Sequence, residues 1–212
     1  MNPEKLGRLI QELEDAAGQT EVSPRPQILA GLPYLNAVIL ESLRLGTPFP
    51  GLSRVVPEQG LEVSGVSVPP GTIVSVPAYT QQTSVDNFSP LPLEFIPERW
   101  LDTESEEFNT RCSALMCFSY GKLIGDNEYQ LNLNLHVGAF SCLGRNLAIQ
   151  ELRLALTQLV LNLEMKFAPA FDPVQFIADV DNIKTTFFRY PLRLTVRSRE
   201  RETPTSWSNI RD

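Results

Sequence analysis

The chain has 212 residues, of which 42% are hydrophobic, and a net charge of −7, so it is long enough to bury one sizeable core. This acidic balance provides no basic stripe for phosphates and speaks against nucleic-acid binding. Three cysteines without a C-x-x-C pair indicate neither a zinc site nor a disulfide framework. No stretch approaches the roughly 20 apolar residues that span a bilayer.

The first residues predict two helices. Asn2-Pro3-Glu4 combines a capping side chain, an early proline and an acid, which is typical of a helix start. Apolar residues then recur at helical spacing until Gly18, a typical stop. A polar, proline-bearing loop over residues 19–33 leads to a second helix, which carries Glu41 and Arg44.

Residues 54–79 predict short strands joined by turns. The strand-like runs are 54–56, 61–63 and 73–76, and glycine and proline residues separate them. A helical turn is expected at 85–88, before the segment Phe95-Ile96-Pro97-Glu98-Arg99-Trp100.

Glu41 and Arg44 are three residues apart, so they share one face of their helix. A carboxylate can accept hydrogen bonds from two guanidinium groups, and Arg99 supplies a second arginine farther along the chain. Taken alone, an E-x-x-R pair is usually a solvated helix pair worth a few tenths of a kcal/mol.

Cys142 lies in the run Phe140-Ser141-Cys142-Leu143-Gly144-Arg145, just before the most strongly predicted helix. A helix start favours the ionised thiol, and Gly144 lets a flat macrocycle approach the backbone. A lone cysteine of this kind is more often an inert buried thiol. The helix is expected to bury a wide apolar face, made of Leu147, Leu152, Leu156, Leu159, Val160 and Leu163.

The last third of the chain predicts β-structure and a tail. Phe187-Phe188 and residues 192–196 are expected to form a hairpin or strand pair, and a polar tail follows at 198–212. The only histidine, His136, is expected to be a surface residue. We therefore expect one domain over residues 1–197, mainly α with small β-sheets (α+β).

In this order, the E-x-x-R pair, the P-E-R-W segment, F-S-Y-G and C-L-G-R strongly resemble the cytochrome P-450 family, the haem-thiolate monooxygenases. The resemblance is to the C-terminal part of that fold, with a fungal character. It implies that Cys142 is the axial thiolate ligand of haem iron and that Phe118 begins the cysteine loop and shields the sulfur. It also implies that Gly144 lies against the haem, that Arg54 pairs with a haem propionate, and that Glu41, Arg44 and Arg99 form a structural charge triad. A bidentate guanidinium–carboxylate contact suits arginine at position 54.

The family's loop has the form F-x-x-G-x-x-x-C-x-G, but here seventeen residues, 122–138, separate Phe118-Ser119-Tyr120-Gly121 from Ala139. Deleting them restores the pattern. Codons for Gly121-Lys122-Leu123 can contain an intron donor site, so we interpret 122–138 as an in-frame retained intron. The alternative is a genuine loop insertion, which surface loops tolerate.

The resemblance also implies a reaction: insertion of one oxygen atom from dioxygen into a small organic substrate, with electrons from a reductase. No segment matches the family's central acid–threonine helix, so a truncated, inactive fragment is an alternative hypothesis. A third is a haem-free interaction module that docks through the helix at 143–163. Relatives are usually anchored to the endoplasmic reticulum membrane by an N-terminal helix, for which no counterpart is expected here, and the substrate is not predicted.

Overall fold

A computed structural model describes residues 2–18, 25–51, 53–118, 142–182 and 186–199 of the chain. Helices joined to small antiparallel sheets make up these residues, which confirms the predicted α+β class. The predicted insertion at 122–138, with His136, and most of the tail at 198–212 lie outside the described residues. No helix of the described ranges is long and apolar enough to cross a membrane.

The helical elements, in chain order, are α1 (Pro3–Ala17), α2 (Pro26–Ala30), α3 (Pro33–Leu45), α4 (Ala78–Gln82), α5 (Val85–Phe88), the 3-10 turn η1 (Pro97–Trp100), α6 (Glu106–Ala114), α7 (Arg145–Asn162) and α8 (Pro173–Ala178). The strands are β1 (Arg54–Val55), β2 (Leu61–Val63), β3 (Val66–Val68), β4 (Ile73–Val74), β5 (Leu163–Phe167), β6 (Val180–Asn182), β7 (Thr186–Phe188) and β8 (Leu194–Ser198).

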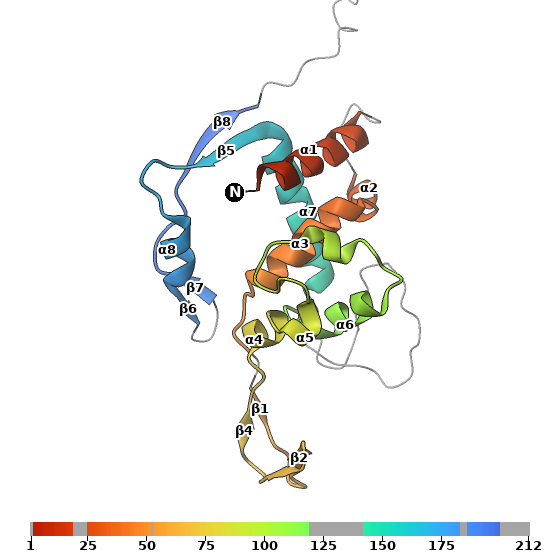
Figure 1. Cartoon of the computed structure of the whole chain (residues 1–212), viewed down its shortest axis with the longest axis vertical. Coiled ribbons are helices and arrows are strands. Elements are labelled where there is room, and N and C mark those ends of the chain that lie inside the picture. The colour runs from red at the N-terminus through yellow and green to blue at the C-terminus, as the bar shows by residue number, and fades with distance from the viewer. Residues whose placement is uncertain (1, 19–24, 52, 119–141, 183–185, 200–212) are drawn as a thin grey trace, which may run out of the picture.

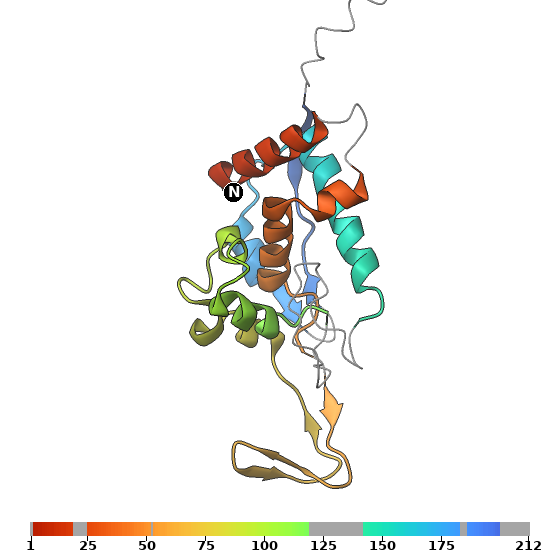
Figure 2. The same ribbon diagram turned by 90° about the vertical axis from the view of Figure 1, so that its right-hand side faces the viewer.

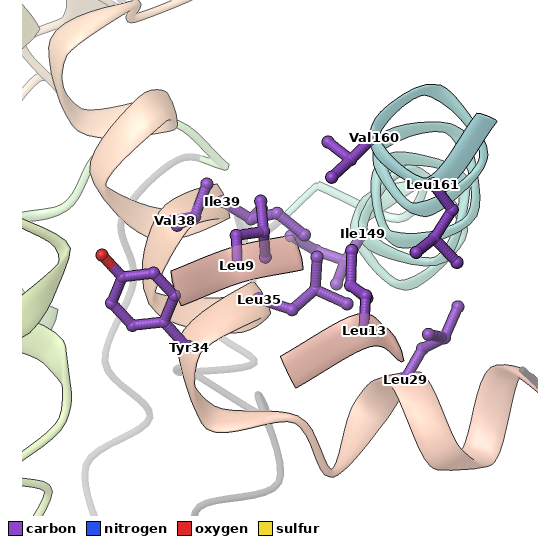
Figure 3. Packing of buried hydrophobic residues seen from close by; sticks show 10 residues of the cluster. All are labelled: Leu9, Leu13, Leu29, Tyr34, Leu35, Val38, Ile39, Ile149, Val160 and Leu161. Atoms are coloured by element: carbon purple, nitrogen blue, oxygen red, sulfur yellow. The ribbon is translucent and has the colours of Figure 1, made fainter. Parts of the chain in front are cut away.

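Helix α3 lies at the centre of the molecule between two hydrophobic clusters. On one side α1, α2 and α7 pack against it, and Figure 3 shows their side chains converging. Leu13, Leu29 and Leu35 are fully buried there, and each contributes about 1.5–3 kcal/mol through its burial. The first cluster is Leu9, Leu13, Leu29, Tyr34, Leu35, Val38, Ile39, Ile149, Val160 and Leu161.

The second cluster covers the opposite side of α3 and joins it to α5, η1 and α6. Phe88 and Trp100 have their ring centroids 6.0 Å apart, and Trp100 meets Phe108 edge-on at 6.4 Å. Cys112 and Cys117 are buried in this cluster and act as small apolar residues. Because α3 contacts both clusters, it fixes the positions of the segments on either side.

The strands of the described residues pair in four two-stranded antiparallel sheets: β1–β4, β2–β3, β5–β8 and β6–β7. The arm made by β1 to β4 projects away from the helices, as Figures 1 and 2 both show. The β2–β3 turn places Ser64 and Gly65 at φ of 50° and 80°, the backbone of a tight type I′ hairpin in which glycine is favoured. In the β6–β7 sheet, Thr186 N–H donates to Pro48 O at 2.9 Å and joins β7 to the segment after α3.

The predicted buried face of α7 is correct for Val160, which is buried, and for Leu156, which packs against the first cluster, but it is wrong for three leucines. Leu147, Leu152 and Leu159 are 62%, 38% and 43% exposed, although their spacing favoured deep burial. The helix instead turns Ile149, Arg153 and other residues toward α2 and α3. Leucines occur on more than one side of α7, so spacing alone does not select the side that packs.

Arg153 shows how a charged residue enters that buried face. Its guanidinium Nε donates to Asn36 Oδ1 at 2.8 Å, and burial lowers the pKa of Arg153. Its aliphatic stem supplies apolar surface while the head keeps a polar contact. The arginine that interrupts the leucine pattern therefore marks the packed face of α7.

Other local predictions need correction. Asn2 precedes α1 as expected, but its side chain makes no capping hydrogen bond. Helix α2 forms inside the predicted loop, and α4, α6 and β3 were not predicted. The segments at 187–188 and 192–196 do not pair with each other, because β7 pairs with β6 and β8 pairs with β5. Short elements of this kind depend on tertiary partners that local patterns do not reveal.

Candidate functional site

The carboxylate of Glu41, on the last turns of α3, accepts five hydrogen bonds. Its Oε1 receives Arg44 Nη2 at 2.8 Å, Arg99 Nε at 3.1 Å and the backbone N–H of Ile96 at 2.8 Å. Its Oε2 receives Arg44 Nε at 2.8 Å and Trp100 Nε1 at 2.9 Å. The predicted triad of Glu41, Arg44 and Arg99 is therefore brought together, and Trp100 completes it.

The two guanidinium groups use their remaining donors on backbone carbonyls. Arg44 donates to Gln82 O at 2.8 Å, Pro92 O at 2.6 Å and Glu94 O at 3.0 Å. Three further carbonyls surround Arg99, those of Phe88 at 3.1 Å, Pro90 at 3.3 Å and Leu91 at 3.2 Å. These contacts tie α3 to the irregular segment before η1, which has no regular backbone ladder of its own.

The charges in this buried cluster partly compensate one another. Burial alone raises the pKa of Glu41, but hydrogen bonds from Arg44 and Ile96 outweigh it and hold this pKa below its usual range. Burial lowers the pKa of Arg99, and Glu41 offsets part of that effect. One carboxylate between two arginines leaves excess positive charge, which the carbonyl dipoles stabilise.

The second group of predicted residues lies at the N-terminal end of α7. The backbone N–H of Cys142 donates to Phe118 O at 3.1 Å, and Arg145 N–H donates to Cys142 O at 3.2 Å. The first bond joins segments that are far apart in the sequence, and the second leads into α7. The Cys142 side chain is exposed, in contrast to the buried Cys112 and Cys117, whose pKa values burial raises to about 12.

Cys142, Phe118 and Arg54 line the same cavity of about 900 Å³, within the size range of small-molecule and cofactor sites. Phe49, Met116 and Cys117 contribute to its wall. Gly144 is not part of this lining. A Cβ added to Gly144 would meet the Sγ of Cys142 at 3.8 Å, so the glycine does border the sulfur. The residues of the Glu41 carboxylate cluster are not among those that line the cavity.

Arg145 and Gln82 are residues of this region that the sequence interpretation did not single out. Arg145 is buried at the first turn of α7, with its guanidinium carbon 5.8 Å from the centroid of the Phe118 ring. Desolvation lowers its pKa, and the neighbouring Cys117 and Cys112 oppose that effect. The sequence does mark Arg145, because it is a charged residue directly after the C-x-G motif. It does not mark Gln82, which lies in a helix that was not predicted.

The described features define a class of protein. A helical fold with small sheets, a buried glutamate–arginine network and a cavity-facing cysteine before a long helix are typical of haem-thiolate proteins. The family model described as Cytochrome P450 matches residues 1–124, more than half of the chain, and the chain belongs to this family. The match includes Glu41, Arg44, Arg54, Arg99 and Phe118 and ends before Cys142 and Gly144.

Curated fungal relatives agree with this assignment. The chain is 39% identical over 75% of its length to cytochrome P450 monooxygenase astJ of Aspergillus oryzae, of which it covers 29%. It is 36% identical over 79% of its length to cytochrome P450 monooxygenase FUM2 of Gibberella moniliformis, covering 32% of that protein. With cytochrome P450 monooxygenase lcsI of Purpureocillium lilacinum the identity is 33% over 95% of the chain and 35% of the relative. The chain therefore spans about a third of the length of these relatives.

Proposed function

We propose that this chain is the haem-ligand part of a cytochrome P450 monooxygenase and that Cys142 is the axial thiolate. The observation that carries the proposal is that Cys142, Phe118 and Arg54 line one cavity, although they are distant in the sequence. Family membership implies haem. The assignment of these three residues to it is the proposal.

The residues present fit a haem group. The exposed thiol of Cys142 is available as a ligand, and Arg54 supplies a guanidinium suited to a propionate carboxylate. Gly144 leaves open the volume beside the sulfur that a side chain would fill. The hydrogen bond from Cys142 N–H to Phe118 O fixes the backbone that carries the ligand.

Bound haem would supply an iron that activates dioxygen, and a thiolate ligand donates electron density that favours cleavage of the O–O bond. The chain itself has the tasks of ligation and orientation. Phe118 and Cys117 add apolar surface to the cavity that Cys142 lines. The Glu41 cluster holds the segments behind the cavity in place.

The reaction we propose is insertion of one oxygen atom into a small organic substrate, with electrons from a reductase. The names of the relatives support the monooxygenase class. The net charge of −7 gives no support for a nucleic-acid partner.

Substitution of the thiol tests the ligand assignment. The chain, reconstituted with hemin, is reduced and exposed to carbon monoxide, and its absorption is recorded for the wild type, Cys142→Ala and Cys112→Ala. We expect a thiolate-type spectrum in the wild type and in Cys112→Ala, because Cys112 is buried away from the cavity, and its loss in Cys142→Ala. An unchanged spectrum in Cys142→Ala contradicts the assignment.

We further propose that residues 122–138 are an insertion foreign to the family, translated from a retained intron. Two observations support this. The family match ends at Ile124, three residues into the segment, and Phe118 and Cys142 are already joined by a hydrogen bond across it. Because the flanks already meet, the short link of residues 119–121 and 139–141 would suffice to close the loop.

Transcript sequencing tests the insertion directly. Spliced transcripts that lack the codons for 122–138 are expected, and a full set that retains them contradicts the intron. A deletion of 122–138 in the protein provides a second test. If the segment is foreign, the deletion variant binds hemin at least as tightly as the full chain, whereas a functional loop insertion predicts weaker binding.

A haem-free interaction module is a second candidate, favoured by the exposed Leu147, Leu152 and Leu159 on α7. The same hemin titration separates the two functions. If neither the full chain nor the deletion variant changes the absorption of added hemin, the docking function is favoured and the haem proposal fails.

A further inference from the structure

Gln82 is the last residue of α4, and its side chain is completely buried. Its helix neighbours Ala78 and Gln81 line the cavity that holds Cys142, but Gln82 is not among the lining residues. A buried amide must place both its donor and its acceptor on partners, because an unsatisfied one costs about 1–3 kcal/mol. The partners of Gln82 therefore indicate what it holds together.

The amide connects two separate segments. On one side, Nε2 donates to the carbonyl of Arg44 at 2.8 Å and to Thr47 Oγ1, both at the C-terminal end of α3. On the other side, Oε1 accepts the backbone N–H of Met116 at 2.7 Å. Gln82 is thus a bridge from the helix of the Glu41 cluster to the segment that follows α6.

The Met116 side of this bridge leads directly to the cysteine. Met116, Cys117 and Phe118 are consecutive and all line the cavity. The carbonyl of Phe118 then accepts the N–H of Cys142 at 3.1 Å. One short run of backbone therefore separates the Gln82 contact from the residue that carries the sulfur.

We propose that Gln82 is a positioning residue that sets the place of the Met116–Phe118 segment, and through it of Cys142, relative to the Glu41 cluster. The expected effect of Gln82 on the cofactor rests on the proposed haem function. Its expected effect on the backbone positions of Met116 and Cys142 does not, because it depends on contacts within the chain alone. The two effects can be measured separately.

The backbone of Gln82 allows the side chain to be tested without detaching α4. Its own carbonyl accepts Arg44 Nη1 at 2.8 Å, and this bond does not depend on the side chain. Gln82→Met keeps the length of the side chain but removes both the donor and the acceptor. Gln82→Glu keeps an oxygen that can accept Met116 N–H, but it loses the donor to the Arg44 carbonyl and buries a charge, so it does not serve as a control.

Thr47→Val is the matched control. It removes one partner of the same amide on the α3 side and conserves shape, but it leaves the contact with Met116 intact. If the network only stabilises the fold, Thr47→Val and Gln82→Met should change the hydrogen exchange of Met116 and Cys142 alike. If Gln82 positions the segment, only Gln82→Met should change it.

The experiment has two readouts on the full chain. Amide hydrogen exchange without cofactor is expected to be at least about fivefold faster at both Met116 and Cys142 in Gln82→Met, since a hydrogen bond of typical strength is lost. After loading with hemin, the reduction potential and the rate of hemin dissociation are expected to change in Gln82→Met. Both readouts are expected to stay near the wild-type values in Thr47→Val.

Unchanged exchange at Met116 and Cys142 in Gln82→Met overturns the proposal. Equal acceleration in Thr47→Val also overturns it, because the effect is then general loosening. If the wild type takes up no hemin, the proposed haem function fails, and the exchange data still decide whether Gln82 holds the cysteine end.

Discussion

The Glu41 cluster and the Cys142 end of α7 are built in opposite ways. Glu41 is fully buried, and its carboxylate accepts five hydrogen bonds from other groups of the chain. Cys142 is exposed, and the hydrogen bonds that join it to other described residues come from its backbone. The Glu41 cluster is buried and fully hydrogen-bonded by the chain, whereas Cys142 lines a cavity and carries a reactive thiol.

This difference indicates that the Glu41 cluster serves the stability of the fold and that Cys142 serves ligand binding. A buried charge that loses its partners is strongly destabilising, so the Glu41 cluster contributes mainly to the fold. An exposed thiol contributes little to stability and remains available for a ligand. We therefore expect substitutions at the cluster to unfold the protein and substitutions at the cysteine end to change what it binds.

The largest effect is expected for Glu41→Gln. The new amide group presents a donor where Arg44, Arg99, Ile96 or Trp100 already donates, and two guanidinium groups lose their counter-charge. We expect the free energy of unfolding to fall by about 3–5 kcal/mol, measured by urea denaturation. The matched control is Glu98→Gln, a partly exposed pair with Arg8, for which the loss is below about 1 kcal/mol. Equal losses in the two variants would show that the cluster is not special.

Lowering the pH should remove the stabilisation that ionised Glu41 provides more gradually. Because the pKa of Glu41 is lowered in the folded state, its contribution to stability is present above its unfolded pKa of roughly 4.3. The contribution is lost as the pH falls through the folded value. Trp100 Nε1 donates to Glu41, so its fluorescence reports the change.

The measurement uses Trp207→Phe, because Trp207 is the second tryptophan of the chain. The emission of Trp100 is expected to stay constant from about pH 7 to pH 5 and to change below about pH 4. A transition centred near neutral pH would contradict the assignment to Glu41.

The smallest effect on stability is expected for Gly144→Ala at the cysteine end. The backbone of Gly144 has φ −80°, which alanine adopts readily, and the new Cβ meets Sγ at an ordinary 3.8 Å. The free energy of unfolding should change by less than about 1 kcal/mol. Hemin affinity should fall by roughly tenfold if the cofactor lies against this residue, as measured by titration. Unaltered affinity would remove Gly144 from the proposed site.

The sequence predicted the parts of the fold that have strong local patterns. The E-x-x-R spacing placed Glu41 and Arg44 on one helix face, but their grouping with Arg99 was anticipated from the family resemblance, because such a pair alone is usually solvated. Helices α1, α3 and α7 were predicted from periodicity and from their start and stop residues, and C-x-G marked the start of α7.

The parts that could not be predicted depend on tertiary contacts. Trp100 gives no sign in the sequence that its indole donates to Glu41. Gln82 is an ordinary polar residue until Arg44 O and Met116 N–H are placed beside it. The packed side of α7 was misassigned because Arg153, a charged residue, occupies it through a contact with Asn36 that local spacing does not indicate.

The hydrogen bonds to Glu41 also bear on how this part of the fold is stabilised. The polypeptide itself supplies all five donors to the carboxylate. The contribution of the cluster to stability therefore requires no prosthetic group, and it is present whether or not the cavity that Cys142 lines is filled.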